Sequence, residues 1–447
     1  MKFLILSILL VLSNYSGFAQ IHLPAIFANG MVLQQNTKVK IWGNAAPMEK
    51  VGWNKQSYHI RADKKGHWLL NLPTPVAGGP YQIEIFGKNR VILSDVLIGE
   101  VWLCSGQSNM DMPVKGYFNA PVLHADDILI KSPNANIRLF KLERQAADVP
   151  RDSLSGTWQA AGPKSVSDFS AVGYLFGKDL QKFANVPVGV IQSTWGGTPV
   201  EAWMSKEALH EVSENHSLKG GATTKAIHQV PSHLFNGMIA PIVGYGLAGV
   251  LWYQGEQNRY NAEDYRWLLP EMVKSWRTNW GIGEWPFFFV QIAPMKYPKG
   301  QRHLVPLLWE VQTKLATEIP NSGIAVSVDA GDMNNIHPSK KHLIAERLLA
   351  LALEKHYQKA MPSSAPCYQS ISQNEKYLKI RFSNLQMGLT SFGKPLNDFE
   401  IAGDDGVFYP AQAEIKNGEV IVFSEQVDLP IAVRYAFKDW TTGSLYG

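Results

Sequence analysis

The chain has little cysteine, nearly balanced charge and no long apolar segment beyond its start, and each absence excludes a class of protein. Only two cysteines occur among 447 residues, too few for a disulfide scaffold. Cys104 lies in an apolar segment, so we expect it to be a buried small side chain that does not pair with Cys367. The 42 basic and 38 acidic residues leave a net charge of +4 without a dense basic cluster, so we expect no nucleic-acid partner.

Motifs of metal and nucleotide chemistry are absent as well. No His-Glu-x-x-His or Cys-x-x-Cys pattern offers metal ligands. Neither a Walker A motif nor a Gly-x-Gly-x-x-Gly motif follows a predicted strand. We therefore expect neither a metal ion nor an organic cofactor.

Residues 1–19 have the pattern of a secretory signal peptide. Lys2 supplies the positive start, residues 3–12 are almost entirely apolar, and residues 17–19 end in small side chains suited to cleavage. No later segment approaches the roughly 18 apolar residues that a membrane-spanning helix needs. We therefore expect a periplasmic or extracellular protein whose mature form has no membrane contact.

Strand and helix patterns divide the remaining chain into three parts. Residues 20–95 alternate apolar and polar side chains between Gly and Pro turns, which predicts an N-terminal β-sandwich-like module. Residues 96–359 alternate buried strands with amphipathic helices, which favours an α/β domain with a mostly parallel sheet between helices. Residues 360–447 return to strands, joined by a hairpin turn at residues 416–419. The strands predicted in the central part are 101–104, 188–192, 249–253, 287–292 and 324–328, and the helices are 171–183, 265–279, 305–317 and 339–357.

The most informative segment runs from Val101 to Met110, where an apolar strand meets a polar turn that contains Ser108. A turn at the carboxyl end of a strand can present one hydroxyl beside free backbone N–H groups. A serine nucleophile needs that placement, because its attack on an ester creates an oxyanion. The segment is not the Gly-x-Ser-x-Gly elbow of α/β-hydrolases. Taken alone, it is equally compatible with an ordinary turn whose Ser and Asn cap a helix.

Polar segments follow three other predicted strands, and in a parallel sheet all of them meet at one edge. Gly196 and Gly197 let the backbone approach a ligand closely. Gln254 and Asn258 carry side-chain N–H groups that could stabilise an oxyanion. His337 follows the last strand and precedes a proline, in a position that suits a general base. A hydroxyl, oxyanion donors and a histidine at one sheet edge together indicate acyl transfer from serine.

With these segments in hand, the chain resembles the sialate O-acetylesterase family within the SGNH hydrolases. The matching segments are residues 102–110, 193–203, 252–258 and 336–338, with a further likeness at 169–174. The resemblance extends over most of the mature chain. It implies a three-layer α/β/α catalytic domain flanked by β-rich modules. It also implies hydrolysis of O-acetyl esters of sialic acids through an acetyl-serine intermediate.

The resemblance also implies a role for individual residues. Ser108 is expected to be the nucleophile and His337 the base. The backbone N–H groups of Ser108 and Gly197 are expected in the oxyanion hole, with Gly196 as the alternative glycine. The side-chain amide of Gln254 is favoured as the third donor, ahead of that of Asn258. Three residues of the matching segments support the motif, namely Gln107, Asn109 and Glu256.

The chain departs from the family pattern beside the histidine. SGNH enzymes commonly place an Asp three residues before the His, where this chain has Asn334. A neutral amide does not stabilise an imidazolium as a carboxylate does. Three arrangements remain, namely a Ser–His dyad oriented by a backbone carbonyl near Asn334, or recruitment of Asp332 or of Asp329. The dyad is favoured, because an ester is less demanding than an amide. Family members also usually continue past Gly447, so we expect the C-terminal module to be incomplete.

Three alternative functions remain open. An esterase acting on acetyl-xylan or another acetylated polysaccharide would use similar loops. A non-catalytic carbohydrate-binding protein would account for the 14 Trp and 16 Tyr residues and the β-rich flanks. A glycosidase would pair Glu256 with Asp329 or Asp332 across the scissile bond. That enzyme would need no Ser–His pair, so we rank it lowest.

Overall fold

The computed structural model describes residues 20–45, 49–53, 55–220, 226–298, 304–363 and 365–447. The predicted signal peptide, residues 1–19, lies outside the described residues. Within them, no helix has both the length and the apolar character needed to cross a membrane.

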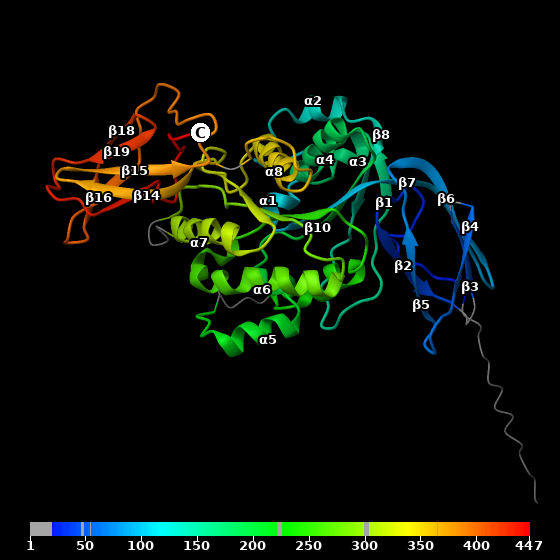
Figure 1. The fold of residues 1–447 in the computed structure, drawn as a ribbon. Coiled ribbons are helices and arrows are strands. Elements are labelled where there is room, and N and C mark those ends of the chain that lie inside the picture. The colour runs from blue at the N-terminus through cyan, green and yellow to red at the C-terminus, as the bar shows by residue number, and fades with distance from the viewer. Residues whose placement is uncertain (1–19, 46–48, 54, 221–225, 299–303, 364) are drawn as a thin grey trace, which may run out of the picture.

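A large, mostly parallel sheet forms the centre of the molecule, as predicted (Figure 1). The strand order is β13-β12-β11-β7-β10-β8-β9, and every neighbouring pair along it is parallel except β8 with β9. β7, which carries the serine segment, is therefore the middle strand. The strands are β7 (Arg90–Gly106), β8 (Asn134–Lys141), β9 (Trp158–Ala161), β10 (Val188–Thr194), β11 (Gly249–Tyr253), β12 (Phe287–Val290) and β13 (Ser322–Ala325).

Helices cover both faces of this sheet, because consecutive side chains of a strand point to opposite faces. Val101 and Leu103 of β7 belong to the core under α6 (Ala262–Trp280) and α7 (Leu304–Glu318). Their neighbours Trp102 and Cys104 belong to the core under α4 (Ala171–Ala184) and α8 (Lys341–Lys355). In Figure 1 these two pairs of helices lie on either side of the strands. The remaining helices are α1 (Ser108–Asp111), α2 (Ala125–Ile130), α3 (Pro163–Ser167), α5 (Lys206–Asn215), the 3-10 helices η1 (Val200–Trp203), η2 (Ile227–Gln229), η4 (Ala240–Ile242) and η5 (Glu256–Asn261), and the π-helix η3 (Phe235–Ile239).

The last strand of the sheet ends earlier than predicted, at Ala325. The strand pairing stops before Ser327, which instead forms hydrogen bonds that involve the side chains of Ser327 and Gln291. Its N–H donates to the Gln291 side chain, and its hydroxyl donates to the carbonyls of Gln291 and Ile292. The helix after His337 starts at Lys341, two residues later than the predicted Ser339. These shifts lengthen the segment that carries His337.

A smaller β-structure at the N-terminus is continuous with the central sheet. β2 (Lys38–Asn44) pairs with β5 (His67–Pro73), and the first half of β7 pairs with β6 (Gly78–Phe86) and β1 (Val32–Gln34). β3 (Glu49–Trp53) lies between β4 (Gln56–Ile60) and β6. The boundary predicted between residues 95 and 96 therefore falls inside a single 17-residue strand, β7.

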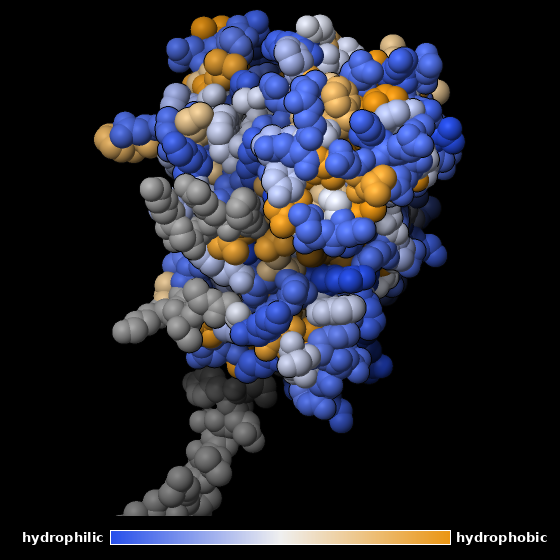
Figure 2. Space-filling model, turned by 90° about the vertical axis from the view of Figure 1, so that its left-hand side faces the viewer, coloured by the Kyte–Doolittle hydropathy of each residue, from blue (hydrophilic) through white to orange (hydrophobic). Residues whose placement is uncertain are grey.

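The C-terminal β-rich module lies at the opposite end of the molecule (Figure 1). Its two sheets enclose a separate small core. The predicted turn joins β18 to β19, with Asn417 at φ 53° and Gly418 at φ 77°, as a tight hairpin requires. Viewed from this end, Figure 2 shows a mostly hydrophilic surface with hydrophobic residues in separate patches. The strands are β14 (Cys367–Asn374), β15 (Tyr377–Ser383), β16 (Phe399–Ala402), β17 (Phe408–Pro410), β18 (Gln412–Lys416), β19 (Glu419–Phe423) and β20 (Ala432–Tyr435).

The two cysteines are both free. Cys104 is buried in the central sheet, where burial raises the pKa of its thiol, while Cys367 is exposed at the start of β14. The expectation that Cys104 is a buried small side chain is therefore confirmed.

Candidate active site

A sharp turn at the end of β7 places Ser108 at the first position of α1. Gly106 adopts φ +127°, and a Cβ at this position would lie 2.3 Å from the carbonyl oxygen of Tyr253 on the neighbouring strand. Only glycine fits that close approach. The backbone N–H of Gln107 then donates to the same carbonyl at 3.0 Å. Ser108 is partly exposed, and its own N–H belongs to the first helical turn, where such groups have no intrahelical partner.

Ser108 and His337 line the same open cavity, which has a volume of about 480 Å³. We call this cavity the serine cleft. The tertiary structure thus brings together two residues 229 positions apart in the sequence. The lining residues are Gln107, Ser108, Asp111, Tyr117, Arg144, Trp195, Gly196, Gly197, Glu256, Gln257, Arg259, Ile336 and His337.

Both glycines predicted for the oxyanion hole line the serine cleft. A Cβ on Gly196 would lie 3.2 Å from the Cβ of Ser108, so a larger residue would crowd the serine. Gly197 adopts φ +69°, in the left-handed region that favours glycine. The loop that carries the two glycines is bonded to the serine turn, because the N–H of Trp195 donates to the carbonyl of Gly106 at 3.1 Å.

The amides of Gln254 and Asn258 have a different placement. Both are buried and neither lines the cleft. Gln254 Nε2 donates to the carbonyl of Thr198 and to Asn258 Oδ1, at 3.1 and 2.6 Å. Asn258 Oδ1 also accepts from the N–H of Val200 at 2.9 Å, while its Nδ2 donates to Glu201. In this arrangement the two amides fix the chain that follows Gly197.

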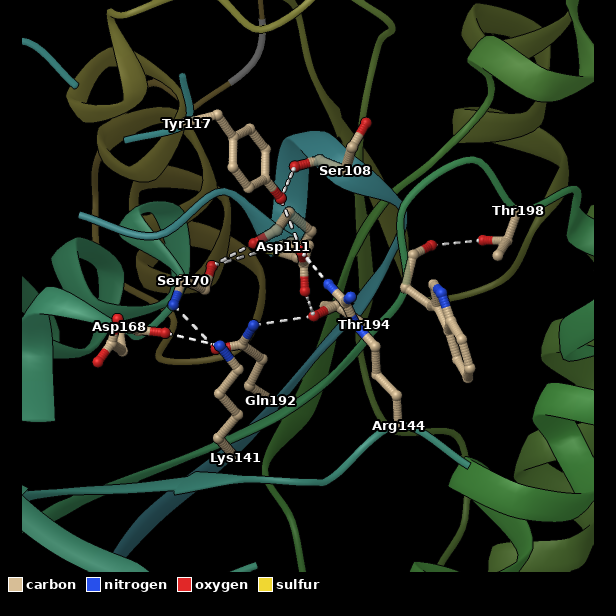
Figure 3. A network of polar contacts seen from close by, with 12 residues as sticks. Ser108, Asp111, Tyr117, Lys141, Arg144, Asp168, Ser170, Gln192, Thr194 and Thr198 are labelled. Atoms are coloured by element: carbon tan, nitrogen blue, oxygen red, sulfur yellow. Dashed lines mark hydrogen bonds and ion pairs between the residues drawn. The ribbon is translucent and has the colours of Figure 1, made fainter. Parts of the chain in front are cut away.

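Asp111 also belongs to the site, although no sequence pattern predicted it. It lies one turn after Ser108, is 4% exposed and lines the cleft. Figure 3 shows three donors converging on its carboxylate, namely Tyr117 Oη (2.6 Å), Thr194 Oγ1 (2.6 Å) and Arg144 Nη2 (2.7 Å). The sequence did contain one indication of this role, because Asp111 follows Ser108 by three positions and residues at this spacing share a helix face.

The His337 imidazole lies in a partly buried environment between charges of opposite sign. Its ring packs edge-on against the Tyr117 ring, with centroids 5.0 Å apart. Burial and the positive charge of Lys341 lower the pKa of His337 to about 4, against the opposing effect of Asp111. The ring is therefore neutral near pH 7, as a base must be before it accepts a proton.

The candidates for orienting His337 bond to other groups. Asp329 makes two hydrogen bonds with Arg347, at 2.6 and 2.7 Å. Asp332 is exposed and accepts from the N–H of Asn334, whose side chain is exposed too. Among the described residues, none of the three accepts a hydrogen bond from the imidazole.

The motif-supporting residues connect the loops around the cleft. Asn109 is fully buried, and its Nδ2 donates to Glu256 Oε1 at 2.5 Å and to the carbonyl of Ile336 at 3.0 Å. Gln107 Oε1 accepts from the N–H groups of Gly255 and Gln257. The turn after β11 and the histidine segment are thus both tied to the serine turn.

The cleft combines a hydroxyl, a neutral imidazole and backbone N–H groups, the elements of acyl transfer. In the part of the chain that the structure describes, no group of three His, Cys, Asp or Glu side chains is arranged to hold a metal ion.

Comparisons with known proteins place this chain among carbohydrate esterases. A family model described as "Carbohydrate esterase, sialic acid-specific acetylesterase" matches residues 98–361. The sialate O-acetylesterase of Mus musculus is 29% identical over 404 residues, covering 76% of this chain and 75% of the relative. That of Homo sapiens is 32% identical over 358 residues, covering 72% of this chain and 68% of the relative. The crystal structure of a carbohydrate acetylesterase from Xanthomonas citri superposes with a TM-score of 0.88 at 33% identity, covering 96% of both chains.

The fold and the comparisons identify this protein as a carboxylic-ester hydrolase of the carbohydrate-esterase type. Within that class, the chain belongs to the family of sialic acid-specific acetylesterases.

Proposed function

We propose that this protein is an exported O-acetylesterase that removes acetyl groups from sialic acids through an acetyl-Ser108 intermediate. The observation that carries the proposal is the meeting of Ser108, His337 and Gly197 in one cleft. The sialate O-acetylesterase relatives support the substrate. The signal-peptide pattern of residues 1–19 supports export to the periplasm or the medium. We also assign the central sheet and its helices to the three-layer SGNH type.

In the proposed reaction, His337 removes the proton of Ser108 Oγ as this oxygen attacks the carbonyl carbon of the acetyl ester. The developing oxyanion is stabilised by the backbone N–H groups of Ser108 and Gly197. The imidazolium then protonates the departing sugar oxygen, which leaves acetyl-Ser108. A water molecule, deprotonated by His337, hydrolyses this ester and releases acetate. Gln254 and Asn258 contribute by fixing the loop after Gly197.

The decisive experiment compares Ser108→Ala with Ser339→Ala. Ser339 lies two residues after His337, and its hydroxyl makes no hydrogen bond among the described residues. We expect Ser108→Ala to lose acetate release by a factor on the order of a million, whereas Ser339→Ala keeps it. A serine-directed organophosphate should label Ser108 in the unmodified protein. Turnover retained by Ser108→Ala would rule out the mechanism, and absence of labelling would favour a non-catalytic carbohydrate-binding protein.

A second candidate substrate is an acetylated polysaccharide such as acetyl-xylan. It is favoured by the match to the carbohydrate acetylesterase from Xanthomonas citri over 96% of the chain. Rates measured on acetylated sialoglycans and on acetyl-xylan under the same conditions separate the two substrates. A larger kcat/KM on acetyl-xylan would replace the sialate assignment while leaving the serine mechanism in place.

The geometry gives little support to a glycosidase. Glu256 Oε1 is bonded to Asn109, and Asp329 is paired with Arg347. Neither Asp329 nor Asp332 lines the cleft. These residues therefore do not form the pair of carboxylates, one on each side of the scissile sugar bond, that a glycosidase needs.

A further inference from the structure

A buried lysine is bonded to the residue that directly follows Ser108. Lys341 is the first residue of α8 and is only 1% exposed. Its Nζ donates to Asn109 Oδ1 at 2.5 Å and lies 5.6 Å from the centroid of the Tyr253 ring. Lysine is almost never fully buried unless its charge is balanced. The position of its counter-charge is therefore informative.

The counter-charge is Glu256, and one amide joins it to the lysine. Asn109 accepts from Lys341 through Oδ1 and donates to Glu256 through Nδ2, both at 2.5 Å. Glu256 is 2% exposed. Burial lowers the pKa of Lys341 to about 7, and the charge of Glu256 opposes this shift. Burial likewise raises the pKa of Glu256, against the effects of Asn109, Lys341 and Arg259. Each charge thus helps the other to remain ionised inside the protein.

The bridge also connects the two residues assigned to catalysis. Asn109 directly follows Ser108, and its Nδ2 donates to the carbonyl of Ile336, which directly precedes His337. Lys341 is on the helix that follows His337. A single buried amide therefore couples the serine helix, the histidine segment and the helix after it.

Two charged groups act on the His337 ring from different elements. Lys341, from α8, disfavours the imidazolium, whereas Asp111, from α1, favours it. Around the bridge, Glu256 faces Lys341, Arg259 and the hydroxyl groups of Tyr253 and Tyr297. Among these, Lys341 is the cation that acts on the imidazole.

We propose that Lys341 is a positioning residue: its ammonium, held by Asn109 and balanced by Glu256, sets Ser108 and His337 relative to each other. This inference rests on the proposed serine mechanism. Burial disfavours the imidazolium of His337, and the cation of Lys341 adds to this effect. A neutral imidazole accepts the serine proton, so the cation extends the esterase activity to lower pH. The hydrogen bond from Lys341 to Asn109 also connects α8 to the serine turn.

The test is the pH profile of kcat/KM for Lys341→Met, Lys341→Gln and the matched control Lys340→Met. Methionine removes both the charge and the hydrogen bond, while glutamine removes the charge and retains a donor for Asn109. Without the cation the pKa of His337 rises. We therefore expect the acid limb, the fall of kcat/KM at low pH, to move to higher pH in both Lys341 variants. Lys340 is exposed, and its loss should leave the limb in place.

The outcomes separate this inference from the proposed function. An unmoved acid limb in a folded Lys341 variant would overturn the positioning role, even if kcat falls, because a purely structural lysine would lower the rate without shifting the limb. If methionine prevents folding, the glutamine variant provides the same readout. Organophosphate labelling of Ser108 in the unmodified protein tests the serine mechanism independently, so failure of one does not imply failure of the other.

Discussion

The hydroxyl of Tyr117 donates a 2.6 Å hydrogen bond to the carboxylate of Asp111. The ring of the same tyrosine packs edge-on against His337. Through this side chain, the acid on the serine helix fixes the position of an aromatic wall beside the imidazole. None of the three predicted orienting groups bonds to the imidazole among the described residues, whereas the Tyr117 ring contacts it directly.

Tyr117 should contribute to catalysis mainly through its ring. Tyr117→Phe removes the hydrogen bond to Asp111 but keeps the contact with His337. We expect kcat to fall by a few-fold and the free energy of unfolding by about 1 kcal/mol. Tyr117→Ala removes both contacts and should lower kcat by a further factor of about ten. Steady-state kinetics and denaturant unfolding measure these effects, and equal kcat values for the two variants would contradict the role of the ring.

Asp111 should shift the pH profile in the direction opposite to Lys341. Its charge raises the pKa of His337, so Asp111→Asn lowers that pKa further. A base with a lower pKa stays neutral at lower pH, and the acid limb of kcat/KM should therefore move to lower pH. The variant should also lose about 1–3 kcal/mol of stability, because Arg144 loses its charged partner. A limb that moves upward would disprove the assigned sign.

Arg144 should discriminate between charged and neutral substrates. Its side chain is 47% exposed, lines the cleft and lies over the Trp195 ring at 5.7 Å. Among the described residues, Asp111 bonds only to the Nη2 of this guanidinium, so its other N–H groups can bind a substrate carboxylate. We expect Arg144→Met to lower kcat/KM on acetylated sialic acid about tenfold, a loss of about 1.4 kcal/mol.

The controls for Arg144 are a neutral ester and a distant arginine. Turnover of p-nitrophenyl acetate should change little in Arg144→Met. Arg266→Met, on the exposed side of α6, should change neither rate. Equal losses on both substrates would show that Arg144 serves the serine site in general and does not bind a substrate carboxylate.

Asp329 should contribute to stability and not to the orientation of His337. Burial alone would raise its pKa, but the hydrogen bonds and charge of Arg347 outweigh burial and lower the pKa below 3.8. Stability from this ion pair is thus present above pH 3.8 and is lost as the pH falls through the folded-state pKa. We expect Asp329→Asn to lower the free energy of unfolding at pH 7 by about 2 kcal/mol.

The comparison for Asp329 is the exposed Asp332. Unfolding measured between pH 7 and pH 2 should show the Asp329→Asn deficit shrinking toward zero at the acid end, whereas Asp332→Asn matches the unmodified protein throughout. In both variants kcat/KM should fall at the same acidic pH as in the unmodified protein. A large loss of kcat in Asp332→Asn, with stability intact, would reinstate that residue as the group that orients His337.

Much of the fold could be predicted because its signals are local. The strand β11 coincides with its predicted range, and α4 and α6 differ from theirs by at most three residues at either end. Side-chain alternation along a strand and apolar periodicity along a helix arise from neighbours in the sequence. The serine turn was recognisable for the same reason, since a glycine and a small polar residue follow an apolar strand.

The partners within the site depend on contacts that no local pattern encodes. Lys341 meets Asn109 across 232 positions, and Arg144 meets Asp111 across 33. The amides of Gln254 and Asn258 have the chemistry of oxyanion donors, yet packing directs them to the chain after Gly197.

The sequence by itself determined which residues reach the carboxyl edge of the sheet, because strand direction and turn chemistry are set within a few residues. Only the tertiary structure decided which of those residues share a cleft. Burial and hydrogen bonding join segments that are distant in the chain, and these interactions place Asp111 and Lys341, and not the acids nearest in sequence, around His337 and the turn that presents Ser108.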